Sequence, residues 1–244
     1  MDKKNQILMS VLGVFALVIV TVGVSYAFFS YSRVGETTNT ITSGDIQFSY
    51  VEGSEAKLEN AFPVSDEIGA ADETKPYTFT VSGSQTGQAD LRYNVTLMSN
   101  NTGNSKVFTN DQIKISLQET KSGTYFVGSA TEGKKLSELT AVSSVVDGGT
   151  TITNTNGFAP NTSTGECVVV GNAEAKPEGE TYKLKMWISY DVDYSNTKLT
   201  GDGTDENNDA QTSVGKYNGF SYSLKVKVDA QGTNMYTGTT GNQG

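Results

Sequence analysis

The segment TYKLKMWISYDV, residues 181–192, decides the fold because its apolar and polar residues alternate with a period of two. Successive side chains of a β-strand point to opposite faces, so this alternation is typical of a half-buried antiparallel strand. The pattern predicts that the even-numbered residues face a core, namely Tyr182, Leu184, Met186, Ile188 and Tyr190. Trp187 lies alone on the polar side, where it either packs under a loop or marks a contact surface for a partner.

The same alternation recurs along the rest of the chain. It appears in DIQFSYV (45–51), PYTFTVS (76–82), LRYNVTL (91–97), IKISL (113–117) and GFSYSLKVKVDA (219–230). In the third of these segments, Asn94 and Thr96 fall on the outward face. Three shorter segments, GTYFVG, TTIT and ECVVVG, also resemble strands, whereas residues 131–146 fit a short helix or a further strand. About eight to ten antiparallel strands without helical patterns between them predict an all-β sandwich, jelly-roll-like, over residues 43–231.

Composition excludes several classes of function. The chain of 244 residues contains no histidine and one cysteine, and its formal net charge is −9. Without histidine there is no Ser-His-Asp or Cys-His nucleophile, no HExxH zinc motif and no imidazole metal site. A net acidic chain lacks the basic surface that phosphate binding needs, which argues against nucleic acid as a partner. We therefore expect no enzymatic activity and no cofactor, and we expect Cys167 to be a buried small residue.

The first 27 residues have the organisation of an export signal. Lys3 and Lys4 precede an uncharged, largely apolar run over residues 7–24. Ser25 and Ala27 then supply small residues three and one positions before a cut, so we expect cleavage before Phe28. The alternative is an uncleaved membrane anchor, because the apolar run approaches the roughly 20 residues that span a bilayer. In either case the N-terminal lysines place the rest of the chain outside the cell.

Cleavage before Phe28 would leave residues 28–42 as a mobile segment that cannot form a core by itself. Its β-branched threonines and apolar residues suit addition to an exposed sheet edge. The candidate residues of this donor strand are Phe28, Phe29, Tyr31, Val34 and Ile41. Head-to-tail donation does not close on itself and therefore produces a filament. The alternative is that the segment pairs within its own domain as an ordinary first strand.

A polar acidic segment, residues 195–218, separates the two long closing strands. The carboxylates of Asp202, Asp205 and Asp209 are oxygen ligands of the type that calcium prefers, although their spacing does not match an EF-hand loop. The alternative is a solvated surface loop without metal. The Gly-, Thr- and Asn-rich residues 232–244 predict a flexible C-terminal tail.

Several of these segments resemble one family. SYAFFS (25–30), ITSGDIQFSY (41–50) and the two closing strands resemble the TasA/camelysin family of exported proteins of Gram-positive bacteria. The resemblance implies a jelly-roll domain, cleavage by a dedicated signal peptidase, and assembly into biofilm-matrix fibres by donation of the freed N-terminal segment. It also allows for an accessory matrix protein. Camelysin is classed as a metallopeptidase, but this chain has no histidine or zinc motif to which that activity could be assigned.

These observations together predict a secreted structural protein, displayed at the surface or in the extracellular matrix of a Gram-positive bacterium. Its subunits would polymerise with one another head to tail. The alternative in a different class is a membrane-anchored monomeric adhesin or binding module. A secreted, camelysin-like metallopeptidase is the third and weakest hypothesis.

Overall fold

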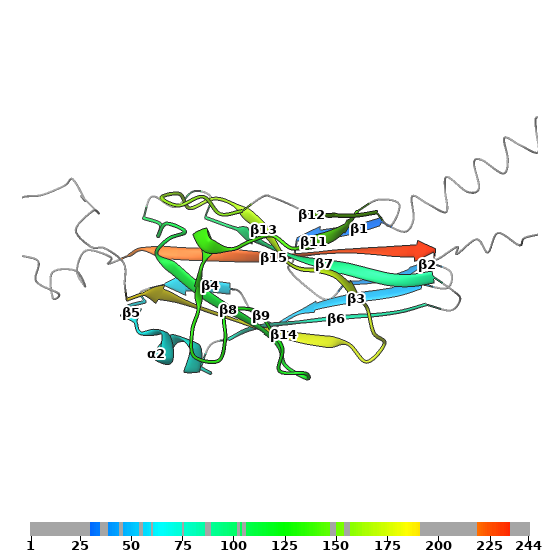
Figure 1. Cartoon of the computed structure of the whole chain (residues 1–244), viewed down its shortest axis with the longest axis horizontal. Helices are drawn as coiled ribbons and strands as arrows, with labels where there is room; N and C mark the ends of the chain where they lie inside the picture. Colours follow the sequence, from blue (N-terminus) through cyan, green and yellow to red (C-terminus); the bar gives the residue numbers. More distant parts are fainter. Residues whose placement is uncertain are drawn as a thin grey trace, which may run out of the picture.

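The chain folds as an all-β sandwich of two mainly antiparallel sheets, as the computed structural model shows (Figure 1). The structure describes residues 30–34, 39–43, 46–53, 56–59, 61–74, 76–85, 89–101, 103, 106–146, 150–153, 157–190 and 219–234. The expected export signal (1–27), the acidic segment with Asp202, Asp205 and Asp209, and residues 235–244 lie outside these ranges.

The first sheet contains five strands, with β15 at its centre. Four of them follow one another in the order β1 (Ser30–Val34), β15 (Ser221–Asn234), β7 (Ala89–Ser99) and β13 (Glu166–Glu174). The fifth, β4 (Ala56–Glu59), also pairs with β15. The longest ladder joins β15 to β7 without interruption, from Leu224 opposite Ser99 to Asn234 opposite Ala89.

The second sheet contains eight strands. The main order is β10 (Lys134–Lys135), β8 (Ile113–Glu119), β14 (Glu180–Ser189), β6 (Tyr77–Gln85), β3 (Ile46–Glu52) and β2 (Asn39–Ser43). In addition β9 (Tyr125–Val127) pairs with β8, and β5 (Pro63–Val64) pairs with β14 in parallel. The remaining elements are the two-stranded sheet of β11 (Ser143–Val146) and β12 (Thr150–Thr153), helix α2 (Asp66–Ala71) and the 3₁₀ helix η1 (Leu136–Glu138).

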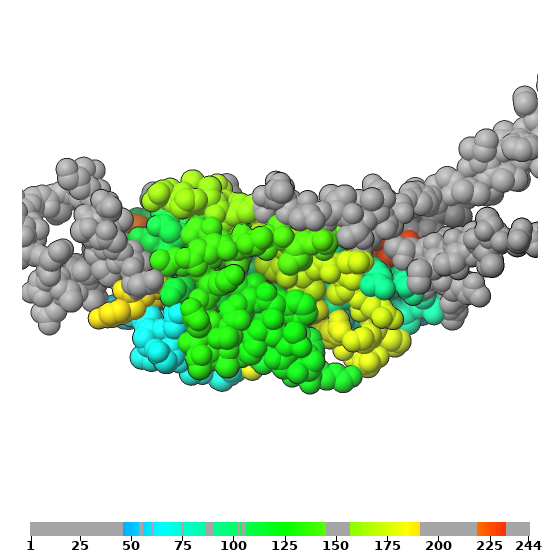
Figure 2. All heavy atoms as spheres, viewed as in Figure 1, coloured from blue at the N-terminus to red at the C-terminus, as the bar shows by residue number. Residues whose placement is uncertain are grey.

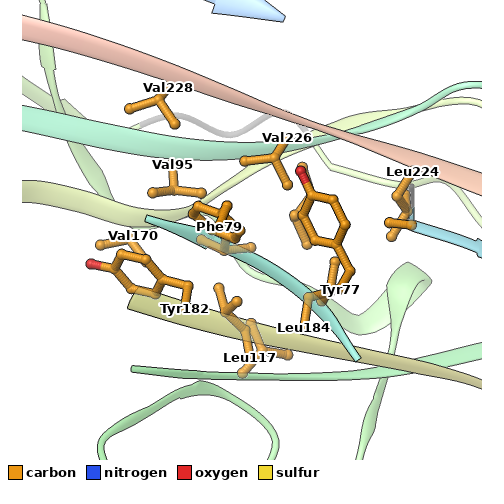
Figure 3. Close-up of a cluster of buried hydrophobic side chains, with 14 of the residues drawn as sticks. Tyr77, Phe79, Val95, Leu117, Val170, Tyr182, Leu184, Leu224, Val226 and Val228 are labelled. Carbon is orange, nitrogen blue, oxygen red and sulfur yellow. The ribbon is translucent and has the colours of Figure 1, made fainter. Parts of the chain in front are cut away.

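The core lies between the two sheets, where apolar side chains from both meet (Figure 3). The alternation in the sequence predicts most of it. Tyr182, Leu184 and Ile188 of β14 are buried, as are the alternating apolar residues of β6, β7, β8 and β15. Phe79 stacks on Tyr182 across neighbouring strands, with ring centroids 5.0 Å apart. The prediction for Tyr190 is wrong, because β14 ends at Ser189 and leaves Tyr190 69% exposed.

The outward face of β7 differs from the alternation in the sequence. Asn94 and Thr96 are buried although they lie on the face away from the core. β11 packs against β7 and β13, and we infer that it covers the outward face of β7. Asn94 Oδ1 accepts the backbone N–H of Asn172 at 3.0 Å, so its buried amide has a partner. A polar residue in an alternating pattern therefore marks a second packed surface here.

Two boundaries differ from the sequence prediction, and the structure also assigns the elements within residues 131–146. β2 extends to Ser43, one residue past the expected end of the N-terminal segment. β15 extends to Asn234, so residues 232–234 belong to a strand and not to a tail. Residues 131–146, left between helix and strand, contain β10, η1 and β11 in succession.

Candidate functional site

The outer edge of β15 is divided between two short strands (Figure 1). β7 pairs along one edge of β15. On the other edge, β4 pairs with Ser221–Leu224 and β1 pairs with Lys227–Gln231. Lys225 and Val226 lie between these two ladders and belong to neither. A sheet edge offers N–H and C=O groups to an added strand, which makes this edge the candidate assembly interface.

The β4 half of this edge rests on a polar network. Tyr222 is fully buried, and its hydroxyl donates to Asn110 Oδ1 at 2.5 Å. The amide of Asn110 donates in turn to the carbonyls of Ala159 and Thr164. Burial raises the pKa of Tyr222, so its hydroxyl stays protonated and can donate. This half of β15 is therefore held to the rest of the domain by several directional bonds.

The β1 half of the edge rests on apolar packing. Val228 and Ala230, which lie within the β1 ladder, are buried in the core. β1 adds an antiparallel ladder of five residue pairs, from Ser30 opposite Gln231 to Val34 opposite Lys227. Gln231 itself is 8% exposed, and within the described part of the chain its Oε1 has no hydrogen-bond partner.

The N-terminal segment connects the edges of both sheets. After β1, the chain passes through residues 35–38 into β2, the outermost strand on that side of the second sheet. Of the sequence-predicted donor residues, Tyr31 and Val34 lie on β1 and Ile41 lies on β2, opposite Phe48. Ser25, Ala27, Phe28 and Phe29 lie outside the described residues. In the isolated chain the described part of the segment pairs in its own domain, which differs from the mobile segment expected, because two open edges are within its reach.

β4 is anchored on its C-terminal side by helix α2. The Asp66 carboxylate accepts hydrogen bonds from Lys114 Nζ at 3.0 Å and from Trp187 Nε1 at 3.2 Å. Glu73, just past the helix, accepts from Lys183 Nζ at 2.7 Å and Lys185 Nζ at 2.6 Å. These bonds attach the connection between β4 and β6 to side chains of β8 and β14.

Trp187 is packed under this helix and is not an exposed contact surface. Its side chain is 4% exposed and lies between Gly69 of α2 and Gly133 of the β9–β10 connection. A Cβ atom at either glycine would overlap the indole ring. Of the two interpretations of Trp187, packing is therefore confirmed, and the sole tryptophan of the chain reports on α2.

The buried titratable groups form structural networks. Tyr93 and Tyr182 hydrogen-bond to each other at 2.5 Å, and Tyr93 donates to the Glu180 carboxylate. Burial raises the pKa of both tyrosines, so they remain neutral donors. Cys167 is fully buried as expected, and burial raises the pKa of its thiol to about 11. A buried neutral thiol is a poor nucleophile, because the thiolate is the reactive form.

One cleft lies on the side of the sandwich formed by β9, β10 and β13. It has a volume of about 320 Å³ and is lined by apolar residues such as Phe126, Leu139 and Val142, with Glu132 and Lys134 beside them. In Figure 2 the segment from β8 to β11, in green, forms much of the face toward the viewer. Phe126 and Val142 are 41% and 38% exposed, so the cleft presents apolar surface to solvent.

The described ranges contain no candidate metal centre and no candidate membrane-spanning helix. No group of three or more Asp, Glu or Cys side chains in these ranges is placed to hold a metal ion. Among the helices that the structure describes, none is long and apolar enough to cross a bilayer. Comparisons with protein-family models, with curated proteins and with solved structures gave no match for this chain.

Proposed function

We propose that this chain is a non-enzymatic structural protein whose copies assemble head to tail by exchanging β1. In an exchanged pair, β1 of one copy would lie on the β15 edge of the next. The observation that carries the proposal is the β1 ladder, which is made on one side entirely by Lys227–Gln231 of β15. The same five residue pairs can form between two copies as well as within one, so exchange requires no new complementary surface.

Mass action decides between the two arrangements. A short linker gives its strand an effective concentration of about millimolar for its own domain, so the closed monomer is favoured in dilute solution. At high local concentration the neighbour's strand competes, and each exchange leaves an open edge that accepts a further copy. We therefore expect monomers when the protein is dilute and open-ended filaments when it is concentrated.

Two buried hydrogen-bond acceptors near the N-terminal segment support the exchange of β1 between copies. Gln231, opposite Ser30, and Gln85, opposite Ile46, each have a buried Oε1 without a hydrogen-bond partner in the described part of the chain. A buried unpaired acceptor costs about 1–3 kcal/mol relative to a satisfied one. Contacts from a second copy that satisfy these groups would favour the assembled form.

The sequence supports an extracellular location for this assembly. The basic start, the apolar run over residues 7–24 and the small residues before Phe28 fit export and cleavage by a signal peptidase. We infer that the fibres belong to the cell surface or extracellular matrix of a Gram-positive bacterium, on the resemblance to TasA/camelysin proteins. The partners would be copies of the same chain, with an accessory matrix protein as a further candidate.

A second candidate function rests on the cleft beside Phe126. A monomeric binding module, retained by residues 1–27 as a membrane anchor, would use this partly apolar cleft of about 320 Å³ to hold a ligand. Sequencing the N-terminus of the exported protein separates the two proposals. A start at Phe28 supports the released subunit, and a start at Met1 supports the anchored module.

A locked variant tests strand exchange directly. Ser32→Cys with Asp229→Cys places two thiols at directly opposite ladder positions, while the native Cys167 is fully buried. Oxidised at low concentration, this variant should form the disulfide within one chain and stay monomeric on concentration. Reduction should restore filaments in light scattering and negative-stain images. Wild-type protein that remains monomeric at every concentration, or a locked variant that still polymerises, would contradict the proposal.

A further inference from the structure

The first sheet has a second edge, on the side of β13. In the described part of the chain β13 is the last strand on that side, beyond β7. It is nine residues long. A long, open edge strand is a template for strands of other molecules, and proteins cover, bend or charge such edges to prevent this pairing. The state of this edge therefore bears on how copies of the chain associate.

The second half of β13 is bent. Its register with β7 shifts twice between Val168 and Ala173. Within this stretch Asn172 has a left-handed φ of 56°. The N–H of Asn172 donates to Asn94 Oδ1, and its C=O accepts from Arg92 Nη1, both at 3.0 Å. Irregularities of this kind interrupt a ladder and turn the strand away from a flat edge.

The first half of β13 is crossed by residues 139–146. Leu139 and Ala141 pack against the core. The N–H of Val142 then donates to the carbonyl of Val168 at 3.2 Å. Next in the chain comes β11, which contacts both β13 and β7 and lies beside β13 in Figure 1. The segment therefore passes around the edge of β13 and uses one of its backbone carbonyl groups.

The outward face next to this crossing is closed to solvent. Asn94 and Thr96 of β7 lie on the face away from the core and are 5% and 6% exposed. Val168 lies opposite Thr96 in the ladder, so it shares that face, and it is 4% exposed. β11 contacts both of these strands and is therefore placed to cover all three side chains.

Gly171 of β13 lies directly against the backbone of β11. An added Cβ atom at Gly171 would overlap the carbonyl oxygen of Ser143 and would stand 2.7 Å from its carbonyl carbon. Glycine inside a strand often marks such a close approach of a second backbone, because any side chain would hold the two apart. The absence of a side chain at Gly171 is therefore what allows β11 to lie on β13.

We propose that residues 139–146 are an edge guard, which closes β13 to strands of other copies and confines strand addition in this sheet to the β15 side. A strand added at β13 would compete for the Val168 carbonyl, to which Val142 already donates. With the guard lifted, the occupant would be β13 of a second copy. Two identical edge strands can pair antiparallel across a two-fold axis, and such an interface gives a closed dimer.

This proposal rests on the proposed function only in that the excluded strand belongs to a second copy. The two processes have different products, because exchange of β1 gives open filaments and pairing of β13 gives closed dimers. The guard is therefore tested in the oxidised, monomeric variant that carries Ser32→Cys and Asp229→Cys, in which β1 cannot be exchanged. The dimer is expected whether or not unlocked chains form filaments, so the two proposals can fail separately.

Gly171→Ala should lift the guard, because the new methyl group would take the place of the Ser143 carbonyl oxygen. The control is Gly157→Ala, where an added Cβ makes only an ordinary contact of 3.8 Å with the carbonyl oxygen of Leu139. Hydrogen exchange in peptides covering residues 139–146 should become about tenfold faster in Gly171→Ala, as expected for the loss of one backbone hydrogen bond. Analytical ultracentrifugation should show dimers for Gly171→Ala and monomers for the control.

Val142→Pro opens the guard without any change in β13. Proline has no N–H, so the hydrogen bond to the Val168 carbonyl is lost. We expect the same dimer as from Gly171→Ala. Trp187 fluorescence should be unchanged in both variants, because Trp187 packs under α2 and reports that the second sheet is still folded.

Dimers in both variants, with unchanged Trp187 fluorescence, would support the edge guard. Faster hydrogen exchange in residues 139–146 without dimers would overturn it, because the bent strand would then resist pairing by itself. Unchanged exchange in Gly171→Ala would overturn the role of Gly171. Association that appears only together with a changed Trp187 signal would also count against the guard, since it would follow from a general loosening of the domain.

Discussion

The two short strands on the outer edge of β15 are similar in length but differ in how the chain holds them. β4 is flanked by β3 before it and by β5 and α2 after it, all of which belong to or lie on the second sheet. β1 is followed by β2 across residues 35–38, and no described element precedes it. Removing β4 from the edge would disturb both sheets, whereas removing β1 requires a change only at one linker. Exchange between copies is therefore expected at β1 and not at β4.

The same edge also differs in what lies beneath it. Under β4, Tyr222 and Asn110 form a hydrogen-bond network that ties β15 to loop 157–165. Under β1, β15 contributes Val228 and Ala230, whose aliphatic side chains pack in the core without hydrogen bonds. The two halves of this edge therefore depend on different interactions of β15. The following predictions weaken the β4 half of the edge and the α2 attachment that follows β4, beginning with the largest effect.

Leu224→Ala should cause the largest loss. Leu224 is 2% exposed, belongs to the core and pairs with both Ala56 of β4 and Ser99 of β7. Truncating a buried leucine costs about 2–5 kcal/mol of unfolding free energy. Urea denaturation would measure this loss. Cross-linking of the N-terminal strand to β15 should persist in the variant, and its disappearance would show that the two halves of the edge are not independent.

Gly69→Ala should loosen the attachment that follows β4. Alanine favours a helix over glycine by about 1 kcal/mol, but the added methyl group would overlap the Trp187 ring. We expect a net loss of up to about 3 kcal/mol through overpacking, with a red shift in Trp187 fluorescence as α2 lifts. Ile68→Ala, at a residue 61% exposed, is the control and should change little. A stabilised Gly69→Ala variant would show that the contact is not rigid.

Tyr222→Phe should weaken the β4 half by about 1–2 kcal/mol, because it leaves the buried Asn110 Oδ1 without its hydroxyl donor. The same bond predicts a pH dependence. Burial raises the pKa of Tyr222, so its contribution is complete below about pH 10 and is lost as the pH rises further. Unfolding midpoints between pH 8 and 11 should fall less steeply in the variant than in the wild type. Parallel curves would assign the alkaline loss to other tyrosines.

Glu73→Gln should have the smallest effect. Glu73 pairs with Lys183 and Lys185 but is largely exposed, so the loss should stay below about 1 kcal/mol. Hydrogen bonds from these lysines hold the pKa of Glu73 below 4.5, so its contribution is present above that pH and is lost as the pH falls. Thermal unfolding at pH 7 and pH 3 should differ less in the variant. If Glu73→Gln lost more unfolding free energy at pH 7 than Gly69→Ala does, the ion pairs would hold α2 more firmly than the Trp187 contact does.

Alternation in the sequence predicts the long strands well because burial on one face dictates every second residue. Ile113, Ile115 and Leu117 are all fully buried, as the pattern requires. The same reasoning misses β5 and α2, since two and six residues are too few to show a period. Their positions depend on contacts with β14, more than a hundred residues away in the sequence. A pattern confined to one segment contains no record of such contacts.

The candidate site was only partly visible in the sequence. Its apolar residues indicate that residues 28–42 suit a sheet edge, and the structure places Tyr31, Val34 and Ile41 on strands. Which edge they join could not be predicted, because the alternation within a segment does not identify the strand with which it pairs. The last residues of β15 escaped notice because the alternation stops at Ala230, although the backbone ladder to β7 continues to Asn234.

The direction of the β1 ladder has a mechanical consequence for a fibre built by exchange. β1 and β15 both run along the long axis of the domain (Figure 1). Tension along a head-to-tail fibre would therefore pull the exchanged strand parallel to its neighbour, and all pairs of the ladder would bear the load together. A force applied across the strands would instead open the pairs one after another. Such a fibre would resist stretching far better than peeling, without any covalent bond between its subunits.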